Sequence, residues 1–319
     1  MKGFRNGVNR SEGQNMYPED ADTAELIDPT GDQFDNSLPA PSPVEVDLSA
    51  QSHRGRVRLN NEDHFWVGRG TRDLQTLMTS LPVTEVPGRC EEAVYAMIVA
   101  DGMGGHAAGE IASQTAITTM IQLVLMTADW IMRPDHGQPE RAMERIAERY
   151  RKVHEAVLQR SEQDPYLSGM GTTMTLACSL GRKLLTAHVG DSRAYLFRKG
   201  VLLQLTRDHT VAQRLADAGL IDPRDVSVHS GRHILTEAIG AGPRAEADIQ
   251  QIELMDGDDV LLCTDGLTGM IGDDAIADIL QRRKRSAEVC QLLIDAALER
   301  GGTDNVTVAL ARYRIPENV

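Results

Sequence analysis

The sequence predicts an α+β fold in which layers of β-strands are covered by helices. Two observations carry this prediction. Short strand-like runs follow one another as pairs joined by tight turns, which is typical of antiparallel neighbours, and the long helical patterns also come in sequential pairs. A regular alternation of strand, helix and strand is therefore excluded. With 319 residues, 41% of them hydrophobic, the chain can bury a sizeable core.

The individual elements follow from the spacing of apolar residues. Residues 94–100 form an unbroken apolar run that stops at Asp101-Gly102, which indicates a buried strand and a turn. Apolar residues repeat along one side of residues 109–127, as they do in a helix. In chain order we expect strands at 65–67 and 94–100, helices at 109–127 and 139–160, strands at 172–180, 184–189, 194–198 and 201–205, short helices within a polar stretch at 208–245, a strand at 260–263, helices at 273–283 and 286–299, and a last strand at 306–313.

Residues 1–46 differ in composition from the rest of the chain. They contain nine acidic and three basic residues, with frequent Pro, Ser, Asn and Gly and no persistent period. Such a segment buries too little apolar surface to fold alone. We therefore expect a disordered acidic N-terminal extension over residues 1–46 and a folded domain over residues 47–319. A docking or autoinhibitory role of the extension is the alternative.

Charge and cysteine content exclude several classes of protein. The 47 acidic residues outnumber the 33 basic ones, for a formal charge of −14, so no nucleic-acid partner is expected. The four cysteines form no CxxC pair, and thiols inside apolar runs, such as Cys178 and Cys263, are typical of a reducing compartment. No apolar signal follows Met1 and no helical pattern is apolar throughout, so we expect a cytoplasmic protein without a membrane span.

Several common catalytic sites are absent, and carboxylates remain. The sequence contains no GxxxxGK[ST] phosphate loop, no HExxH zinc helix and no GxSxG nucleophile elbow. Instead, acidic residues stand at the ends of five expected strands. A single Asp at a strand end is ordinary turn chemistry, but strand ends in a shared sheet converge. Crowded carboxylates stay ionised only beside cations, and oxygen ligands favour Mg²⁺, Mn²⁺ or Ca²⁺ over zinc. The residues concerned are Glu62, Asp63, Asp101, Asp191, Asp265 and Asp304.

Seven short strings occur in an informative order. They are SHRGRVRLNNED at 52–63, VADGMGGH at 99–106, GTT at 171–173, GDSR at 190–193, LTRDH at 205–209, CTDGL at 263–267 and TDNVT at 303–307. In this order they resemble the motifs of the metal-dependent (type 2C) serine/threonine protein phosphatases, and the string DGMGGH resembles their bacterial branch. The resemblance covers about residues 47–314, which is nearly all of the expected folded domain.

The resemblance implies a fold and a two-metal site. The implied fold is a sandwich of two antiparallel sheets, flanked by helix pairs on both sides, with a centre for two Mn²⁺ or Mg²⁺ ions at one end. The positions that match the metal ligands are Asp63, Asp101, Asp265 and Asp304, with the carbonyl of Gly102 and, through water, Glu62. Asp191 and Asp265 match the ligands of a third, weaker metal site. Arg58 matches the side chain that holds the substrate phosphate, and a guanidinium fork suits two phosphate oxygens. The implied catalytic residues are Arg58, Asp63, Asp101 and Asp265.

The implied function is hydrolysis of phosphoserine and phosphothreonine in proteins, by direct attack of a hydroxide that bridges the two ions. The expected partners are phosphoprotein substrates and a cognate serine/threonine kinase of the bacterial, eukaryotic-like type, and we expect a monomer. Two alternatives stay open: a catalytically idle module that binds phosphoproteins, and a phosphomonoesterase that acts on small molecules.

Three positions qualify the resemblance. Met103 stands where many eukaryotic members have a His that is proposed to protonate the leaving group, and Met has no proton to give. His106 is interpreted as a structural residue near a helix start. Residues 210–245 correspond to the variable flap of the family, where we expect His229 and His233 to serve flap packing or phosphopeptide contact in preference to metal binding.

Overall fold

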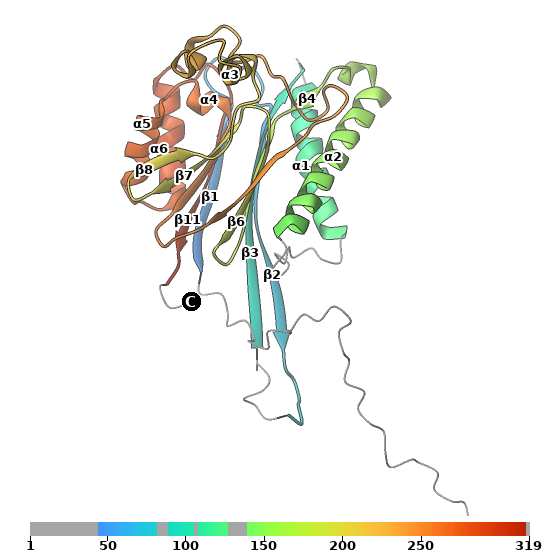
Figure 1. Cartoon of the computed structure of the whole chain (residues 1–319), viewed down its shortest axis with the longest axis vertical. Helices are drawn as coiled ribbons and strands as arrows, with labels where there is room; N and C mark the ends of the chain where they lie inside the picture. The colour runs from blue at the N-terminus through green and yellow to red at the C-terminus, as the bar shows by residue number, and fades with distance from the viewer. Residues whose placement is uncertain (1–43, 82–88, 105–107, 127–138, 317–319) are drawn as a thin grey trace, which may run out of the picture. The chain divides into compact units, whose positions relative to one another are not determined.

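The computed structural model describes residues 44–81, 89–104, 108–126 and 139–316 (Figure 1). These residues form two antiparallel sheets that lie face to face, with helices on their outer sides. The predicted α+β sandwich is confirmed. The first strand begins at Glu45, so residues 45 and 46 belong to the folded domain, and the domain starts slightly before the predicted boundary. The rest of the predicted acidic extension lies outside the described residues.

Within the described ranges, one sheet has five strands and the other has six. The five-stranded sheet has the order β1-β11-β10-β7-β8, with bounds Glu45–His53 for β1, Arg193–Arg198 for β7, Val201–Gln204 for β8, Asp259–Cys263 for β10 and Val306–Arg314 for β11. The six-stranded sheet has the order β2-β3-β5-β6-β9, with β4 paired to β3. Its bounds are Asp63–Gln75 for β2, Arg89–Met103 for β3, Gly171–Thr172 for β4, Met174–Leu180 for β5, Lys183–Val189 for β6 and Asp248–Glu253 for β9.

A pair of long helices covers each sheet, as the sequential helical patterns predict. Helices α1 (Ala108–Met126) and α2 (Pro139–Gln163) pack on the six-stranded sheet, and α5 (Asp273–Gln281) and α6 (Ser286–Glu299) pack on the five-stranded sheet (Figure 1). The shorter helices are η1 (Pro165–Leu167), α3 (Val211–Asp217), η2 (Pro223–Val228) and α4 (Asp265–Thr268). None of the described helices combines the length and the apolar character that crossing a membrane requires.

The core explains why β10 is an unbroken apolar run. Successive side chains of a strand point to opposite faces of its sheet. Val260 and Leu262 pack between the two sheets, whereas Leu261 and Cys263 pack against the outer helices. Because both faces of this strand are covered, every position from Val260 to Cys263 is apolar and buried.

The predicted elements correspond to structure, but two strands were not predicted. These are β1 and β9, which lie at the free edges of the two sheets. Their sequences, EVDLSAQSH and DIQQIE, contain no fully buried residue, so they carry no continuous apolar run. Edge strands need less hydrophobic surface than central ones, and the sequence pattern is correspondingly weak.

Several strands meet at one end of the sandwich. The register places His53 at the end of β1 opposite Val306 at the start of β11, and Cys263 at the end of β10 opposite Val308. In the other sheet, the start of β2 lies opposite the end of β3. The acidic residues that flank these strands are therefore brought to the same end of the molecule.

Candidate metal centre

Asp63 and Asp101 form the middle of the acidic cluster. They lie directly opposite each other on β2 and β3, and Asp63 is only 4% exposed. The Oδ2 atom of Asp63 accepts hydrogen bonds from the hydroxyls of Thr264 (2.8 Å) and Thr307 (2.7 Å). Its buried Oδ1 atom has no hydrogen-bond partner among the described residues. A buried carboxylate oxygen without a donor is a group that a metal ion would satisfy.

The electrostatics of these aspartates show how closely they are packed. Burial raises the pKa of Asp63 to about 7, and repulsion from Asp265 and Asp304 adds to the effect. Burial, followed by repulsion from the neighbouring carboxylates, also raises the pKa of Asp101 well above its ordinary value. Asp265 opens α4 directly after β10, and Asp304 precedes β11. Strand ends therefore supply a set of hard oxygen donors whose charges need a cation.

Arg58 borders this cluster from an adjacent loop. Its Nη2 atom donates a 2.7 Å hydrogen bond to Oδ2 of Asp304, and this contact raises the pKa of the guanidinium. The side chain is 54% exposed. The guanidinium is thus held at the edge of the acidic centre and is still accessible to a ligand.

Asn305 fixes the loop that carries Arg58. Its Nδ2 donates to the carbonyls of Arg54 and Asn60, both at 2.9 Å. Its Oδ1 accepts from the backbone N–H of Glu62 at 2.8 Å. One amide side chain therefore holds both ends of the loop, and it does so next to Asp304 in the chain.

Two glycines allow close backbone packing beside Glu62. A Cβ atom at Gly102 would lie 2.0 Å from the carbonyl oxygen of Gly109, and the N–H of Gly102 donates to the carbonyl of Glu62 at 3.2 Å. A Cβ atom at Gly109 would lie 2.6 Å from Oε2 of Glu62. The Glu62 carboxylate therefore lies against the N-terminal turn of α1, where the helix dipole favours negative charge.

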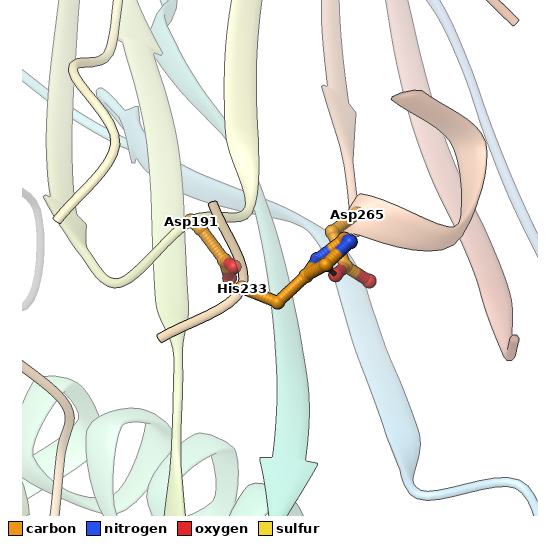
Figure 2. Close-up of side chains that lie close together, drawn as sticks. All are labelled: Asp191, His233 and Asp265. Atoms are coloured by element: carbon orange, nitrogen blue, oxygen red, sulfur yellow. Dashed lines mark ion pairs between the residues drawn. The ribbon is translucent and has the colours of Figure 1, made fainter. Parts of the chain in front are cut away.

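A second potential ligand set lies beside the first. The ligand atoms of Asp191, His233 and Asp265 all lie within 4.8 Å of one another, and Figure 2 shows the three side chains close together. His233 Nδ1 is 3.3 Å from Oδ2 of Asp265. Asp191 is 8% exposed, and burial together with repulsion from Asp265 raises its pKa to about 8. The structure thus brings together the two aspartates predicted for a third metal and adds a histidine to them.

The two flap histidines have different surroundings. His233 lies at the acidic cluster, close to Asp191 and Asp265, so metal binding stands beside the predicted flap packing or phosphopeptide contact as a candidate role. His229 Nδ1 accepts from the N–H of Gly231 at 3.0 Å, which is a local turn contact. His106 lies outside the described residues.

Sequence reasoning did not assign roles to three residues that hold the centre together. They are Thr264, Asn305 and Thr307. Thr264 is adjacent in the chain to Asp265, Asn305 is adjacent to Asp304, and Thr307 lies three positions after Asp304, all within the strings CTDGL and TDNVT. Hydroxyl and amide side chains next to predicted ligands were the available signal, but their partners are distant in the sequence. Asp63 is more than 200 positions away from both threonines.

Comparison with known proteins agrees with this geometry. A family model described as Protein phosphatase 2C matches residues 88–301. The chain is 36% identical over 264 residues to the serine/threonine protein phosphatase PstP of Mycobacterium tuberculosis, which is 82% of this chain and 44% of PstP, so the chain spans less than half of that relative. It is 32% identical over 260 residues to the serine/threonine phosphatase stp of Listeria monocytogenes, which is 82% of this chain and 93% of that protein.

Solved structures give the same relationship. The catalytic domain of PstP in complex with two manganese ions superposes with a TM-score of 0.67 and 34% identity, over 85% of this chain and 99% of that one. The family match covers more than half of the chain, and the relatives share at least 30% identity with it along four fifths of its length. The chain therefore belongs to the protein phosphatase 2C family.

Proposed function

We propose that this protein is a Mn²⁺- or Mg²⁺-dependent phosphatase that hydrolyses phosphoserine and phosphothreonine in proteins. One observation carries the proposal: buried carboxylates converge at one end of the sandwich, an oxygen of Asp63 lacks a donor, and a guanidinium stands beside them. The names of the relatives and the manganese-bound PstP structure support the same activity.

The residues present fit two metal ions, and the proposed ligands are Asp63, Asp101, Asp265 and Asp304, with the Gly102 carbonyl and, through water, Glu62. The chemistry that such ions supply when bound is Lewis-acid activation of water for direct attack on phosphorus, together with neutralisation of phosphate charge. The cluster of Asp191, His233 and Asp265 would hold a third, weaker ion.

The protein's own side chains orient the proposed metal ligands and bind the substrate phosphate. Thr264 and Thr307 fix one oxygen of Asp63, which leaves its other, unpaired oxygen available for a metal ion. Arg58 binds the phosphate of the substrate through N–H groups that Asp304 does not use, and it neutralises charge on the phosphoryl oxygens. Met103 cannot donate a proton, so we infer that the leaving oxygen receives its proton from water.

The proposed partners follow from this activity. They are phosphoproteins and the serine/threonine kinase that forms them. A monomeric state and a cytoplasmic location stay predictions.

The test is phosphate release from a phosphothreonine peptide, measured with Mn²⁺ and with excess chelator. We expect turnover that requires Mn²⁺ and disappears in Asp265→Asn. Asp278→Asn is the matched control, because Asp278 is an exposed aspartate on α5 outside the acidic centre. A folded protein that binds the peptide without releasing phosphate would contradict the proposal in favour of a binding module. Release from p-nitrophenyl phosphate alone would favour a small-molecule phosphomonoesterase.

A further inference from the structure

Three large apolar side chains are exposed on the segments that border the metal centre. Val57 is 64% exposed and Leu59 is 88% exposed, and they lie on either side of Arg58 in the chain. Ile234 is 56% exposed and follows His233, which contacts Asp265. Single exposed apolar residues are common on proteins and need no explanation. These three differ because each is adjacent to a side chain that reaches the acidic cluster.

The backbone that presents Val57 and Leu59 is held firmly. The N–H of Arg56 donates to the carbonyl of Gly302 at 2.7 Å, and the carbonyl of Leu59 accepts from Nη1 of Arg54 at 3.3 Å. The next carbonyl, that of Asn60, accepts from Asn305. The loop therefore does not need to become ordered when a ligand arrives, and an apolar contact made there loses little conformational entropy.

Ile234 is held in the same way on the flap. Its N–H donates to the carbonyl of Gly231 at 3.2 Å, and its carbonyl accepts from the N–H of Val211 at 2.9 Å. Its neighbour Leu235 forms a bridge with Thr210. The acidic centre is therefore bordered by apolar side chains on two segments whose backbone is held by hydrogen bonds, one beside Asp304 and one beside Asp265.

We propose that Val57, Leu59 and Ile234 form a substrate-contact surface that selects an extended polypeptide with apolar residues flanking the phosphorylated residue. The inference rests on the proposed phosphatase function. A phosphoryl group held by Arg58 puts the adjoining peptide residues over Val57 and Leu59, because consecutive residues of an extended chain advance by about 3.3 Å. A small phosphomonoester has no flanking residues with which to cover these side chains. The surface therefore distinguishes a phosphoprotein from a small substrate.

The experiment compares two phosphothreonine peptides that differ only in their flanking residues, Leu in one and Ser in the other. We expect the wild-type protein to hydrolyse the Leu-flanked peptide with a kcat/KM about tenfold higher, which is the order expected for burying one Leu side chain. Leu59→Ser should reduce this preference to about twofold. Leu203→Ser is the matched control, because Leu203 is also an exposed leucine, at 56%, but lies on β8.

Turnover of p-nitrophenyl phosphate, measured for every variant, corrects for any damage to the metal centre. Ile234→Ser is a second variant on the other segment and should lower the same preference. Equal turnover of the two peptides by the wild-type protein, or an unchanged preference in both variants, overturns the inference while leaving the phosphatase function in place. If the wild-type protein releases phosphate from neither peptide, the proposed function fails, and the inference fails with it.

Discussion

Both ends of the β-sandwich bury aspartates, but the two ends differ in whether arginines lie beside the buried carboxylates. At the end away from the metal centre, Asp258 is fully buried and accepts from Nε (2.8 Å) and Nη2 (2.6 Å) of Arg198. Its neighbour Asp259 is 1% exposed and lies 3.1 Å from Arg312 and 3.7 Å from Arg283. At the other end, Asp63 accepts hydrogen bonds from two threonine hydroxyls. Among the described residues, Oδ1 of Asp63 and Oδ1 of Asp259 both lack a hydrogen-bond partner, but Asp259 has arginines beside it and Asp63 has none.

We interpret the difference as one between structural carboxylates and the proposed metal ligands. A fold that can bring arginine to buried aspartates at one end does not do so for Asp63 and Asp101 at the other. Buried carboxylates that repel one another destabilise the protein unless a cation arrives, and such arrangements are concentrated at functional sites. Arg58 does not remove this repulsion, because it contacts Asp304 at the exposed edge of the cluster.

The largest expected effect is the loss of turnover when a carboxylate at the metal end is replaced. In Asp63→Asn we expect Mn²⁺-dependent phosphate release to fall by about a thousandfold or more, since losing a charged ligand removes several kcal/mol and each ~1.4 kcal/mol is tenfold. The free energy of unfolding without metal should stay equal or increase, because a repelling charge disappears. Steady-state kinetics and urea unfolding measure the two quantities. Turnover close to that of the wild-type protein would remove Asp63 from the ligand set.

The next largest expected effect is a loss of stability when Asp258, at the opposite end of the sandwich, is replaced. Asp258→Asn leaves Arg198 without its carboxylate, and because Arg198 is partly exposed we expect a cost of about 1.5–3 kcal/mol of stability, the range for hydrogen bonds to charged groups. Turnover per folded molecule and its dependence on Mn²⁺ should stay unchanged, because Asp258 is remote from the metal centre. Urea unfolding, together with activity at a temperature where the variant is folded, measures both. A lost Mn²⁺ response in a folded variant would show that the two ends are coupled.

Covered strands and exposed strands also differ in how well the sequence predicts them. Strands with two covered faces, such as β10, were predicted from their apolar runs, and the aspartates were predicted because strand ends converge. The edge strands β1 and β9 were not predicted, because half-exposed residues carry little pattern. The hydrogen bonds of Asp63 could not be predicted either, because its partners Thr264, directly after β10, and Thr307, within β11, come next to it only in the folded chain.

A third, smaller effect is the pH dependence of stability without metal. Asp63 and Asp191 have folded-state pKa values of about 7 and about 8, above the ordinary 3.8, so the folded state binds their protons more tightly. The stabilisation is complete below the ordinary pKa, declines as pH rises, and is lost above the folded pKa. The pKa of Asp259 is about 6, so the loss of its contribution to stability is nearly complete at a lower pH. Between pH 6 and 8 the decline from carboxyl groups therefore comes mainly from the metal end, whereas His64, His154 and His188, whose pKa values burial lowers, offset part of it near pH 6.

Urea unfolding at pH 6, 7 and 8 measures this decline. With chelator we expect the free energy of unfolding to fall by about 1–3 kcal/mol over that range, since each group contributes up to about 1.4 kcal/mol per pH unit. With saturating Mn²⁺ the decline should vanish, because the metal replaces the protons. The stabilisation by Mn²⁺ should therefore grow with pH. A metal-free stability that is constant or increases between pH 6 and 8 would contradict the crowded acidic centre.

The smallest expected effect is a change in Mn²⁺ affinity, which tests whether the threonines orient Asp63 as a metal ligand. Thr307→Val keeps the shape of the side chain but removes the hydroxyl that donates to Asp63 at 2.7 Å. Groups that orient a metal ligand typically change metal affinity by about 10–100-fold, so we expect the Mn²⁺ concentration for half-maximal activity to rise about tenfold. Because Thr264 still holds Asp63, kcat at saturating Mn²⁺ should change little, and Thr307→Ser should restore the affinity.

A matched change at the other end of the sandwich separates this role from simple destabilisation. Tyr313→Phe removes a buried hydroxyl that lies 3.0 Å from Oγ of Ser179, a loss worth about 1 kcal/mol of stability. Its Mn²⁺ dependence should match that of the wild-type protein. If both variants lose similar stability and only Thr307→Val requires more Mn²⁺, the hydroxyl acts on the orientation of Asp63. Equal Mn²⁺ dependence in both would assign Thr307 a structural role like that of Tyr313.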